Sequence, residues 1–192
     1  MRPLTDFIDW KILPDSIYLL RGPNGIGKSS LIRSILSESH FTGGLQKIEG
    51  LKIVAHPQIS APMFALPLRL SDVLQWSDEP SSAADRLLGD LNLTRAWDSC
   101  SGGERQRVLL AALFSKAFFQ TKEPTLLVLD EPMNHLDESS QKEVVLLIQD
   151  WIQGGPRRAA IIVSHEEISK LNCTILSLHA ARPGSSLAEA SR

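Results

Sequence analysis

Two short stretches of this sequence carry side chains suited to binding and cleaving a chain of phosphates. The first, residues 22–29, reads GPNGIGKS and fits the pattern G-x-x-x-x-G-K-[ST]. Its glycines let consecutive backbone N–H groups curve around an anion, the Lys28 ammonium can reach the outer phosphates, and the Ser29 hydroxyl can ligate Mg²⁺. This loop predicts a binding site for the phosphates of a nucleotide.

The second stretch is an apolar run, residues 126–129, that ends in Asp130 and Glu131. In an open parallel sheet, the carboxyl end of a strand delivers its side chains to the ligand crevice. The acid at this place holds Mg²⁺ in phosphate-loop ATPases, so Asp130 is a candidate metal ligand through water, and Glu131 is placed to polarise an attacking water. The other interpretation, a strand end with two solvated acids, is disfavoured because the phosphate loop lies on the same chain.

A third stretch, Ser101-Gly102-Gly103-Glu104, has the residue types of a helix start. Ser101 can cap a backbone N–H of the first turn while Glu104 reaches back, which is the S-x-x-E capping box. The two glycines remove side chains from the helix tip, so backbone and hydroxyl donors are open to an incoming phosphate. The apolar face expected to anchor this helix consists of Val108, Leu109, Ala112 and Leu113.

These groups need a scaffold, and the sequence predicts an α/β fold of the phosphate-loop NTPase type with a mostly parallel sheet. Continuous apolar runs, typical of strands covered on both faces, occur at residues 16–20, 53–55, 125–129, 160–163 and 175–178. Helical spacing of apolar residues follows the phosphate loop, at Leu31, Ile32, Ile35 and Leu36. We expect a single domain over residues 1–179, with a small inserted helical subdomain at roughly residues 60–115, and a flexible tail at residues 180–192.

The length and amino-acid composition limit the classes of protein to which this chain can belong. With 192 residues and 43% hydrophobic content, the chain can fill the core of one domain. A formal net charge of −2, without a block of Lys and Arg, argues against nucleic acid or anionic lipid as a partner. Cys100 and Cys173 are too few for a disulfide framework and suggest reduced thiols in the cytosol. No apolar run approaches the ~18 residues of a membrane span, so any membrane role requires a partner.

Taken in order along residues 12–178, the motifs resemble those of ATP-binding cassette (ABC) ATPase subunits, most of all the nucleotide-binding subunit of an ABC transporter. Residues 22–29 resemble the Walker A loop, residues 126–131 the Walker B strand, and residues 100–104 the signature motif. Gln58 occupies the position of the Q-loop glutamine, residues 134–137 that of the D-loop, and His165 that of the switch histidine. Gln58 and His165 stand out only through their positions in this set.

The resemblance implies ATP and Mg²⁺ as cofactors, with hydrolysis of ATP to ADP and phosphate. It assigns catalysis to Glu131, His165 and Gln58, and ligation of Mg²⁺ to Ser29, Gln58 and Asp130. The residues implied to bind the nucleotide are Gly22, Pro23, Asn24, Gly25, Ile26, Gly27, Lys28, Ser29 and Ser30 of one chain and Ser101, Gly102 and Gly103 of a second.

The same resemblance implies partners and a location. A complete site is shared between two subunits, so a chain with one set of motifs is expected to form a homodimer, with a transmembrane permease as the other partner and no nucleic acid. Its implied location is cytoplasmic, peripheral to the inner face of the membrane. The apolar residues 61–68 lie where coupling helices dock in the family, or else pack into the helical subdomain.

Two other functions compete with a transporter subunit. The main alternative to a transporter subunit is a soluble ABC ATPase, such as an iron–sulfur assembly type. A nucleotide-locked scaffold without turnover is disfavoured because Glu131 and His165 are both present.

The sequence departs from the family pattern in three places. Cys100 replaces the usual leucine of the signature, and Glu104 replaces the usual glutamine, which brings a carboxylate near a polyphosphate unless capping directs it away. The aromatic residue that stacks on adenine would fall before Asp6, where there is none. Substitutes are Phe7, Trp10 and Tyr18, of which Tyr18 fits the strand as a core residue.

Overall fold

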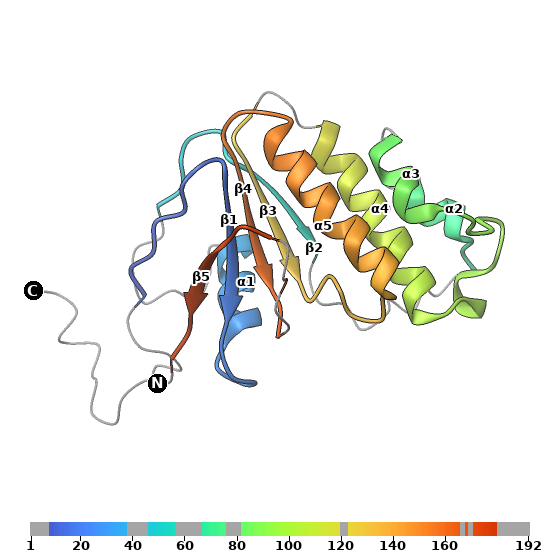
Figure 1. Cartoon of the computed structure of the whole chain (residues 1–192), viewed down its shortest axis with the longest axis horizontal. Coiled ribbons are helices and arrows are strands. Elements are labelled where there is room, and N and C mark those ends of the chain that lie inside the picture. The colour runs from blue at the N-terminus through green and yellow to red at the C-terminus, as the bar shows by residue number, and fades with distance from the viewer. Residues whose placement is uncertain are drawn as a thin grey trace, which may run out of the picture.

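Five parallel strands form the centre of the fold, in the spatial order β2-β3-β4-β1-β5 (Figure 1). In this computed structural model the described residues are 8–37, 46–56, 67–75, 82–119, 123–165, 168 and 171–179. The strands are β1 (Ser16–Arg21), β2 (Lys52–His56), β3 (Thr125–Asp130), β4 (Arg158–Val163) and β5 (Thr174–Ser177). Each strand expected from the sequence is present, and the α/β fold with a parallel sheet is confirmed.

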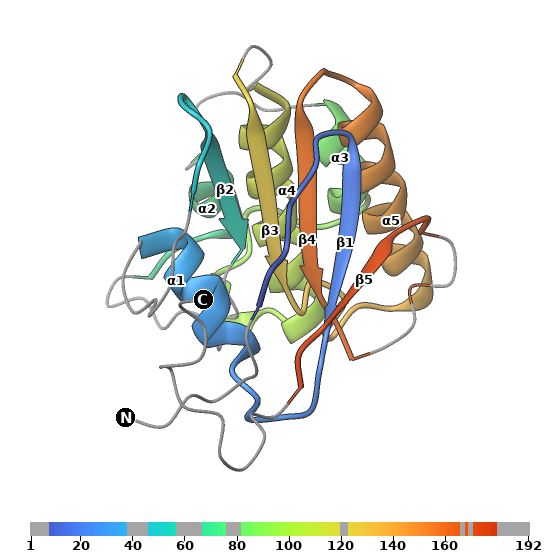
Figure 2. The same cartoon turned by 90° about the vertical axis from the view of Figure 1, so that its left-hand side faces the viewer.

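Helices cover both faces of this sheet (Figures 1 and 2). One face carries α1, and the other carries α4 and α5, with α2 and α3 packed against α4. A 3₁₀ turn, Trp97–Ser99, leads towards α4. The helix bounds are α1 (Lys28–Ser37), α2 (Leu70–Leu74), α3 (Ser82–Leu88), α4 (Gly102–Phe119) and α5 (Glu138–Gln153).

The unbroken apolar run that precedes Asp130 and Glu131 lies in the inner strand β3. All six of its residues are buried. Leu127 and Leu129 belong to the core layer under α4 and α5, whereas Leu126 and Val128 belong to the layer under α1. Because both faces of this inner strand are covered, no position along it favours a polar side chain. Its carboxyl end then delivers Asp130 to the edge of the sheet.

The expected apolar face of α4 was only partly right. Of the four residues that the spacing singled out, Val108 is fully buried and the other three are partly exposed. The helix is packed on two sides, because the sheet and α5 cover one side while α2 and α3 cover the other. A helix covered on two sides loses the single apolar stripe on which the expectation depended. Its buried residues inside the main core are Leu110, Ala111, Phe114 and Ala117.

A small separate core holds the start of α4. It contains Leu70 and Val73 of α2, together with Trp97, Cys100 and Val108. Cys100 is 5% exposed, and its thiol donates to the Ala96 carbonyl oxygen at 3.3 Å. The cysteine therefore fills an apolar position, as a small hydrophobic residue can.

Several expectations cannot be placed on the fold. Phe7, Gln58, residues 61–66 and the tail at 180–192 lie outside the described residues. The division into a domain with an inserted subdomain stays a prediction. Within the part of the chain that the structure describes, no helix is long and apolar enough to cross a membrane.

Candidate active site

The phosphate loop connects β1 to α1, as the sequence predicts. Gly25 and Gly27 adopt positive φ values of 77° and 106°, a backbone conformation that side chains with a Cβ rarely adopt. Lys28 begins α1 and is 8% exposed. Its ammonium donates to the carbonyl oxygens of Gly22, at 2.8 Å, and Pro23, at 3.1 Å. The loop thus folds back over its own lysine and holds the cation beside its glycines.

A cavity of about 380 Å³ opens at this loop. It brings together the carboxyl ends of β1, β3 and β4, because parallel strands end at the same edge of a sheet. The residues that line it are Asn24, Gly25, Gly27, Lys28, Ser29, Ser30, Arg33, Asp130, Glu131 and His165.

Three residues of the loop do not line this cavity. Ile26 is buried in the core under α1. Gly22 is closely packed, since a Cβ added to it would lie 3.0 Å from Ile26 Cγ2 and 3.1 Å from the carbonyl oxygen of Leu178. Pro23 is exposed and contributes its carbonyl oxygen to Lys28. These three residues pack or hydrogen-bond within the loop and do not face the cavity.

Glu131 and His165 form a pair in the lining of the cavity. The two follow neighbouring strands, and His165 Nε2 lies 3.2 Å from Glu131 Oε1. Glu131 is 8% exposed, has a φ of 52°, and donates its backbone N–H to the Val163 carbonyl oxygen at 3.0 Å. Burial raises the pKa of the Glu131 carboxyl, and Asp130 adds to this, while His165 and Lys28 act in the opposite direction. A carboxylate with a raised pKa beside an imidazole is suited to accepting a proton.

Asp130 and Ser29 supply hard oxygen donors to the same cavity. Asp130 is 4% exposed at the end of β3, and the Ser29 hydroxyl group is on the first turn of α1. In sites that bind nucleotides, Mg²⁺ is usually held by a small number of protein oxygens together with phosphate oxygens. The donor set therefore fits Mg²⁺. Gln58, the third expected ligand, lies outside the described residues.

A second cavity, of about 400 Å³, lies at the start of α4. Its lining joins the tip of this helix to the loop that follows Glu131, and it shares no lining residue with the first cavity. The lining residues are Ser101, Gly102, Gly103, Glu104, Arg107, His135, Leu136, Asp137 and Ser140.

The capping box predicted at the tip of α4 is confirmed. Glu104 donates its backbone N–H to Ser101 Oγ at 3.2 Å, and Glu104 Oε2 accepts the Ser101 backbone N–H at 2.7 Å. The second glycine has a packing role that the sequence did not reveal. A Cβ added to Gly103 would lie 2.6 Å from the His135 carbonyl oxygen, so the helix and the loop can approach this closely only at a glycine.

With this geometry described, the chain can be compared with known proteins. Residues 5–134 match the family model described as ABC transporter. This chain belongs to the ABC transporter family. The zinc import ATP-binding protein ZnuC of Acinetobacter baylyi is 33% identical over 173 residues, which are 86% of this chain and 63% of that relative. ZnuC of Vibrio parahaemolyticus is 37% identical over 171 residues, again 86% of this chain and 63% of the relative.

The chain thus spans less than two thirds of the length of these curated relatives. A solved structure, described as a putative ABC transporter ATP-binding protein from Pyrococcus furiosus, superposes with a TM-score of 0.67 over 93% of this chain and 96% of that one. At 23% identity, this likeness concerns the fold alone.

In ABC terms, the two cavities divide the motifs between them. Residues of the stretches that resemble Walker A and Walker B, together with His165, line the first, and residues of the stretches that resemble the signature and the D-loop line the second. Asp137 of the D-loop is also the N-cap of α5, because its Oδ1 accepts the Ser140 backbone N–H at 2.7 Å. That bond, with the Ser140 hydroxyl and the nearby Arg107, lowers the pKa of Asp137. The D-loop backbone is therefore fixed by a helix start.

Two arginines that line the cavities were not singled out from the sequence, nor was Ser140, whose backbone N–H donates to Asp137. Arg33 lies one helical turn after Ser29, and Arg107 lies one turn after Gly103, so each faces the same side as a residue of a motif. The i, i+4 spacing from a motif residue was the signal that could have identified both.

The aromatic partner for adenine is not among the described cavity residues. Tyr18 is a core residue, as expected, and its hydroxyl accepts the Leu13 backbone N–H at 2.9 Å. Trp10 packs against the same core cluster, under α1. Neither residue lines the first cavity, and Phe7 lies outside the described residues.

Proposed function

We propose that this chain hydrolyses ATP and energises an ABC transporter, with two copies of the chain closing around the nucleotides. One observation carries the proposal: the Glu131 and His165 pair shares a cavity with the Lys28 loop and Asp130. A loop for phosphates, a donor set for Mg²⁺ and a candidate base for water are the parts that transfer of a phosphoryl group to water needs.

In the proposed reaction, Lys28 and the loop N–H groups hold the β- and γ-phosphates, and Ser29 and Asp130 hold Mg²⁺, directly or through water. When bound, Mg²⁺ neutralises charge that develops on the phosphate oxygens. Glu131 polarises the water that attacks the γ-phosphate in line and accepts its proton, and the products are ADP and phosphate. His165, 3.2 Å from Glu131, orients this carboxylate and faces the γ-phosphate.

The second cavity supports the proposed homodimer. Its helix tip offers N–H groups and a serine hydroxyl to an anion, which is the contact that a helix N-terminus makes with a phosphate. Because the two cavities of one chain share no lining residue, we propose that the signature face covers the nucleotide held by the other chain. Gln58 is proposed to join that site as a third contact to Mg²⁺ and water.

The cargo is proposed from the relatives. Those named above are zinc import ATP-binding proteins, so we propose a divalent metal ion such as Zn²⁺ as the transported substrate. The partner is then a transmembrane permease, and the chain works at the inner face of the membrane. The soluble iron–sulfur assembly alternative is not favoured by these relatives.

The catalytic part of the proposal is tested with Glu131→Gln, which keeps the size of the side chain and removes its charge. Turnover of ATP should fall by roughly 10²-fold or more, while ATP binding persists. Sedimentation with ATP and Mg²⁺ should show more dimer for this variant than for the wild type. Equal turnover by the two proteins would remove Glu131 from the mechanism.

The transport part needs the membrane. The chain should co-purify with a multi-spanning protein from detergent-solubilised membranes, and the purified pair in vesicles should take up Zn²⁺ when ATP is supplied. ATP-independent uptake, or co-purification with soluble assembly proteins in place of a permease, would reject the transporter assignment.

A further inference from the structure

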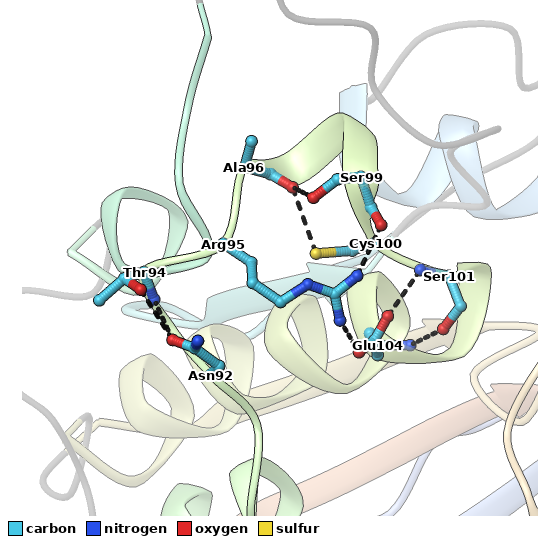
Figure 3. Close-up of polar contacts among 8 residues, drawn as sticks. All are labelled: Asn92, Thr94, Arg95, Ala96, Ser99, Cys100, Ser101 and Glu104. Atoms are coloured by element: carbon cyan, nitrogen blue, oxygen red, sulfur yellow. Dashed lines mark hydrogen bonds and ion pairs between the residues drawn. The ribbon is translucent and has the colours of Figure 1, made fainter.

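Glu104 is one of the residues at which the sequence departs from the family pattern. Both oxygens of its carboxylate accept hydrogen bonds. Oε2 accepts the Ser101 backbone N–H at 2.7 Å, within the capping box, and Oε1 accepts a short hydrogen bond from Arg95 Nη1 (Figure 3). Figure 3 shows the Arg95 guanidinium lying between Ser99 and Glu104. The pairing spans nine residues and closes the segment before α4 onto the first turn of the helix.

Arg95 is itself held in place from several directions. Its Nη2 donates to the Ser99 carbonyl oxygen at 2.6 Å, and its backbone N–H donates to the Asn92 carbonyl oxygen at 3.1 Å. Its own carbonyl oxygen accepts the Leu70 backbone N–H at 3.1 Å, which connects this segment to α2. An arginine that is already held at its backbone and at one end of its fork loses less conformational freedom when it binds a carboxylate.

The charge at this place matters because Glu104 lines the second cavity beside a helix N-terminus. A helix N-terminus attracts anions, and an uncompensated carboxylate on its first turn would repel a polyphosphate. The other acid of that lining, Asp137, is bound to the start of α5. The pKa of Glu104 is lowered mainly by the Ser101 backbone and hydroxyl hydrogen bonds, with Arg95 contributing, so the carboxylate stays ionised, and Arg95 is the cation hydrogen-bonded to it.

We propose that Arg95 is a positioning residue for the nucleotide that the signature face covers. It holds the Glu104 carboxylate in the capping box and compensates its charge, so that the tip of α4 can approach a triphosphate. This inference rests on the proposed function. It assigns a role to a residue outside the motifs, and it explains how a glutamate is accommodated in the signature of this chain.

The test measures the ATP concentration needed for half-maximal dimer formation, by sedimentation of the full chain in the Glu131→Gln background. Arg95→Met should raise this concentration about tenfold, because Glu104 loses the cation that is hydrogen-bonded to it. Arg95→Lys keeps the charge and should recover part of the loss. Adding Glu104→Gln to Arg95→Met should bring the value to within about twofold of that for Glu104→Gln alone, since the two residues act as one unit.

Arg86→Met is the matched control. Arg86 is 36% exposed against 39% for Arg95, and it pairs with Glu143 and Asp150 of α5, away from both cavities. It should leave ATP-driven dimer formation unchanged. Melting temperatures identify any variant that is merely unfolded.

Two outcomes would overturn the inference alone: an Arg95→Met variant that dimerises as well as its parent, or a loss that Glu104→Gln does not relieve. If no variant responds to ATP, including the one with Arg95 intact, the proposed function fails and the inference fails with it.

Discussion

Glu131 combines two unfavourable conditions in one residue. Its backbone has a φ of 52°, which a residue with a Cβ rarely adopts, and the residue is only 8% exposed. Burial of a charge costs free energy, and the raised pKa of this group expresses that cost. Glu104 is the opposite case, since hydrogen bonds from Ser101 and the charge of Arg95 lower its pKa. The two glutamates therefore affect stability in opposite directions.

This difference predicts how two Glu→Gln variants depend on pH. A carboxyl whose folded pKa is raised destabilises the fold above that pKa, and the penalty disappears as the pH falls below the unfolded value. Glu131→Gln should therefore raise the melting temperature at neutral pH and should lose this advantage in acid. Thermal unfolding at a series of pH values measures it.

Glu104→Gln serves as the contrast in the same experiment. Its folded pKa is lowered, so the ionised group stabilises the fold above the unfolded pKa, and this contribution is lost as the pH falls through the folded pKa. The variant should melt below the wild type at neutral pH and converge with it in acid. If both variants shifted the melting temperature in the same direction, the result would contradict the view that burial destabilises the Glu131 carboxylate while capping stabilises the Glu104 carboxylate.

At the residue scale, the sequence could predict which side chains gather but not all of their partners. Lys28, Asp130 and His165 do lie around one cavity, because each lies at or after the carboxyl end of a parallel strand in the same sheet. The role of Arg95 could not be predicted. It depends on the path of the segment between α3 and α4, which the packing of α2 and Trp97 determines and no short pattern encodes.

At the scale of elements, the close approach of α4 to the D-loop predicts unequal effects of two neighbouring alanines. A Cβ at Gly102 would lie 3.4 Å from the His135 ring, which can move, whereas a Cβ at Gly103 would lie 2.6 Å from the His135 carbonyl oxygen. Gly102→Ala should be neutral or slightly stabilising, since alanine loses less backbone conformational entropy on folding than glycine. Gly103→Ala should lose about 1–3 kcal/mol by overpacking.

Urea unfolding of the two variants measures the difference. Equal stabilities would mean that the helix and the loop separate freely, and the packing role of Gly103 would then be rejected.

The end of α5 depends on a buried arginine. Arg158, the first residue of β4, is 2% exposed, stacks on the Trp151 ring at 5.2 Å and donates Nη1 to the Trp151 carbonyl oxygen at 2.6 Å. Lysine keeps the charge but lacks the planar fork, so Arg158→Lys should destabilise the chain by about 1–2 kcal/mol. Arg157→Lys is the matched control, because Arg157 is exposed. Equal melting temperatures for the two variants would contradict this role.

The elements themselves were largely predictable. Buried parallel strands are read from continuous apolar runs, and α1 follows from the spacing after the phosphate loop. The burial pattern of α4 was not predictable, because a helix enclosed by the sheet and by α2 and α3 follows its neighbours rather than a single stripe. Arg158 is another such case, since nothing in the local pattern distinguishes it from the exposed Arg157.

For the whole molecule, the arrangement of the two cavities matters most. The loop from Glu131 to Asp137 begins at the first cavity and ends at the second, so one segment is in contact with both. A nucleotide in the first cavity and a phosphate chain at the second would thus be sensed by the same few residues. Under the proposed function, that loop connects the two active sites of a dimer.

This arrangement predicts that two inactive chains can restore each other. Lys28→Ala disables the first cavity and Ser101→Arg blocks the second, so each variant alone should have almost no ATPase activity. A mixed dimer pairs one intact first cavity with one intact second cavity. An equal mixture should recover about a quarter of wild-type activity, since about half of the dimers are mixed and each has one whole site. A chain carrying both changes, mixed with either single variant, is the control and should recover nothing. If the equal mixture is no more active than its components, although both variants melt like the wild type, the shared two-chain site is wrong.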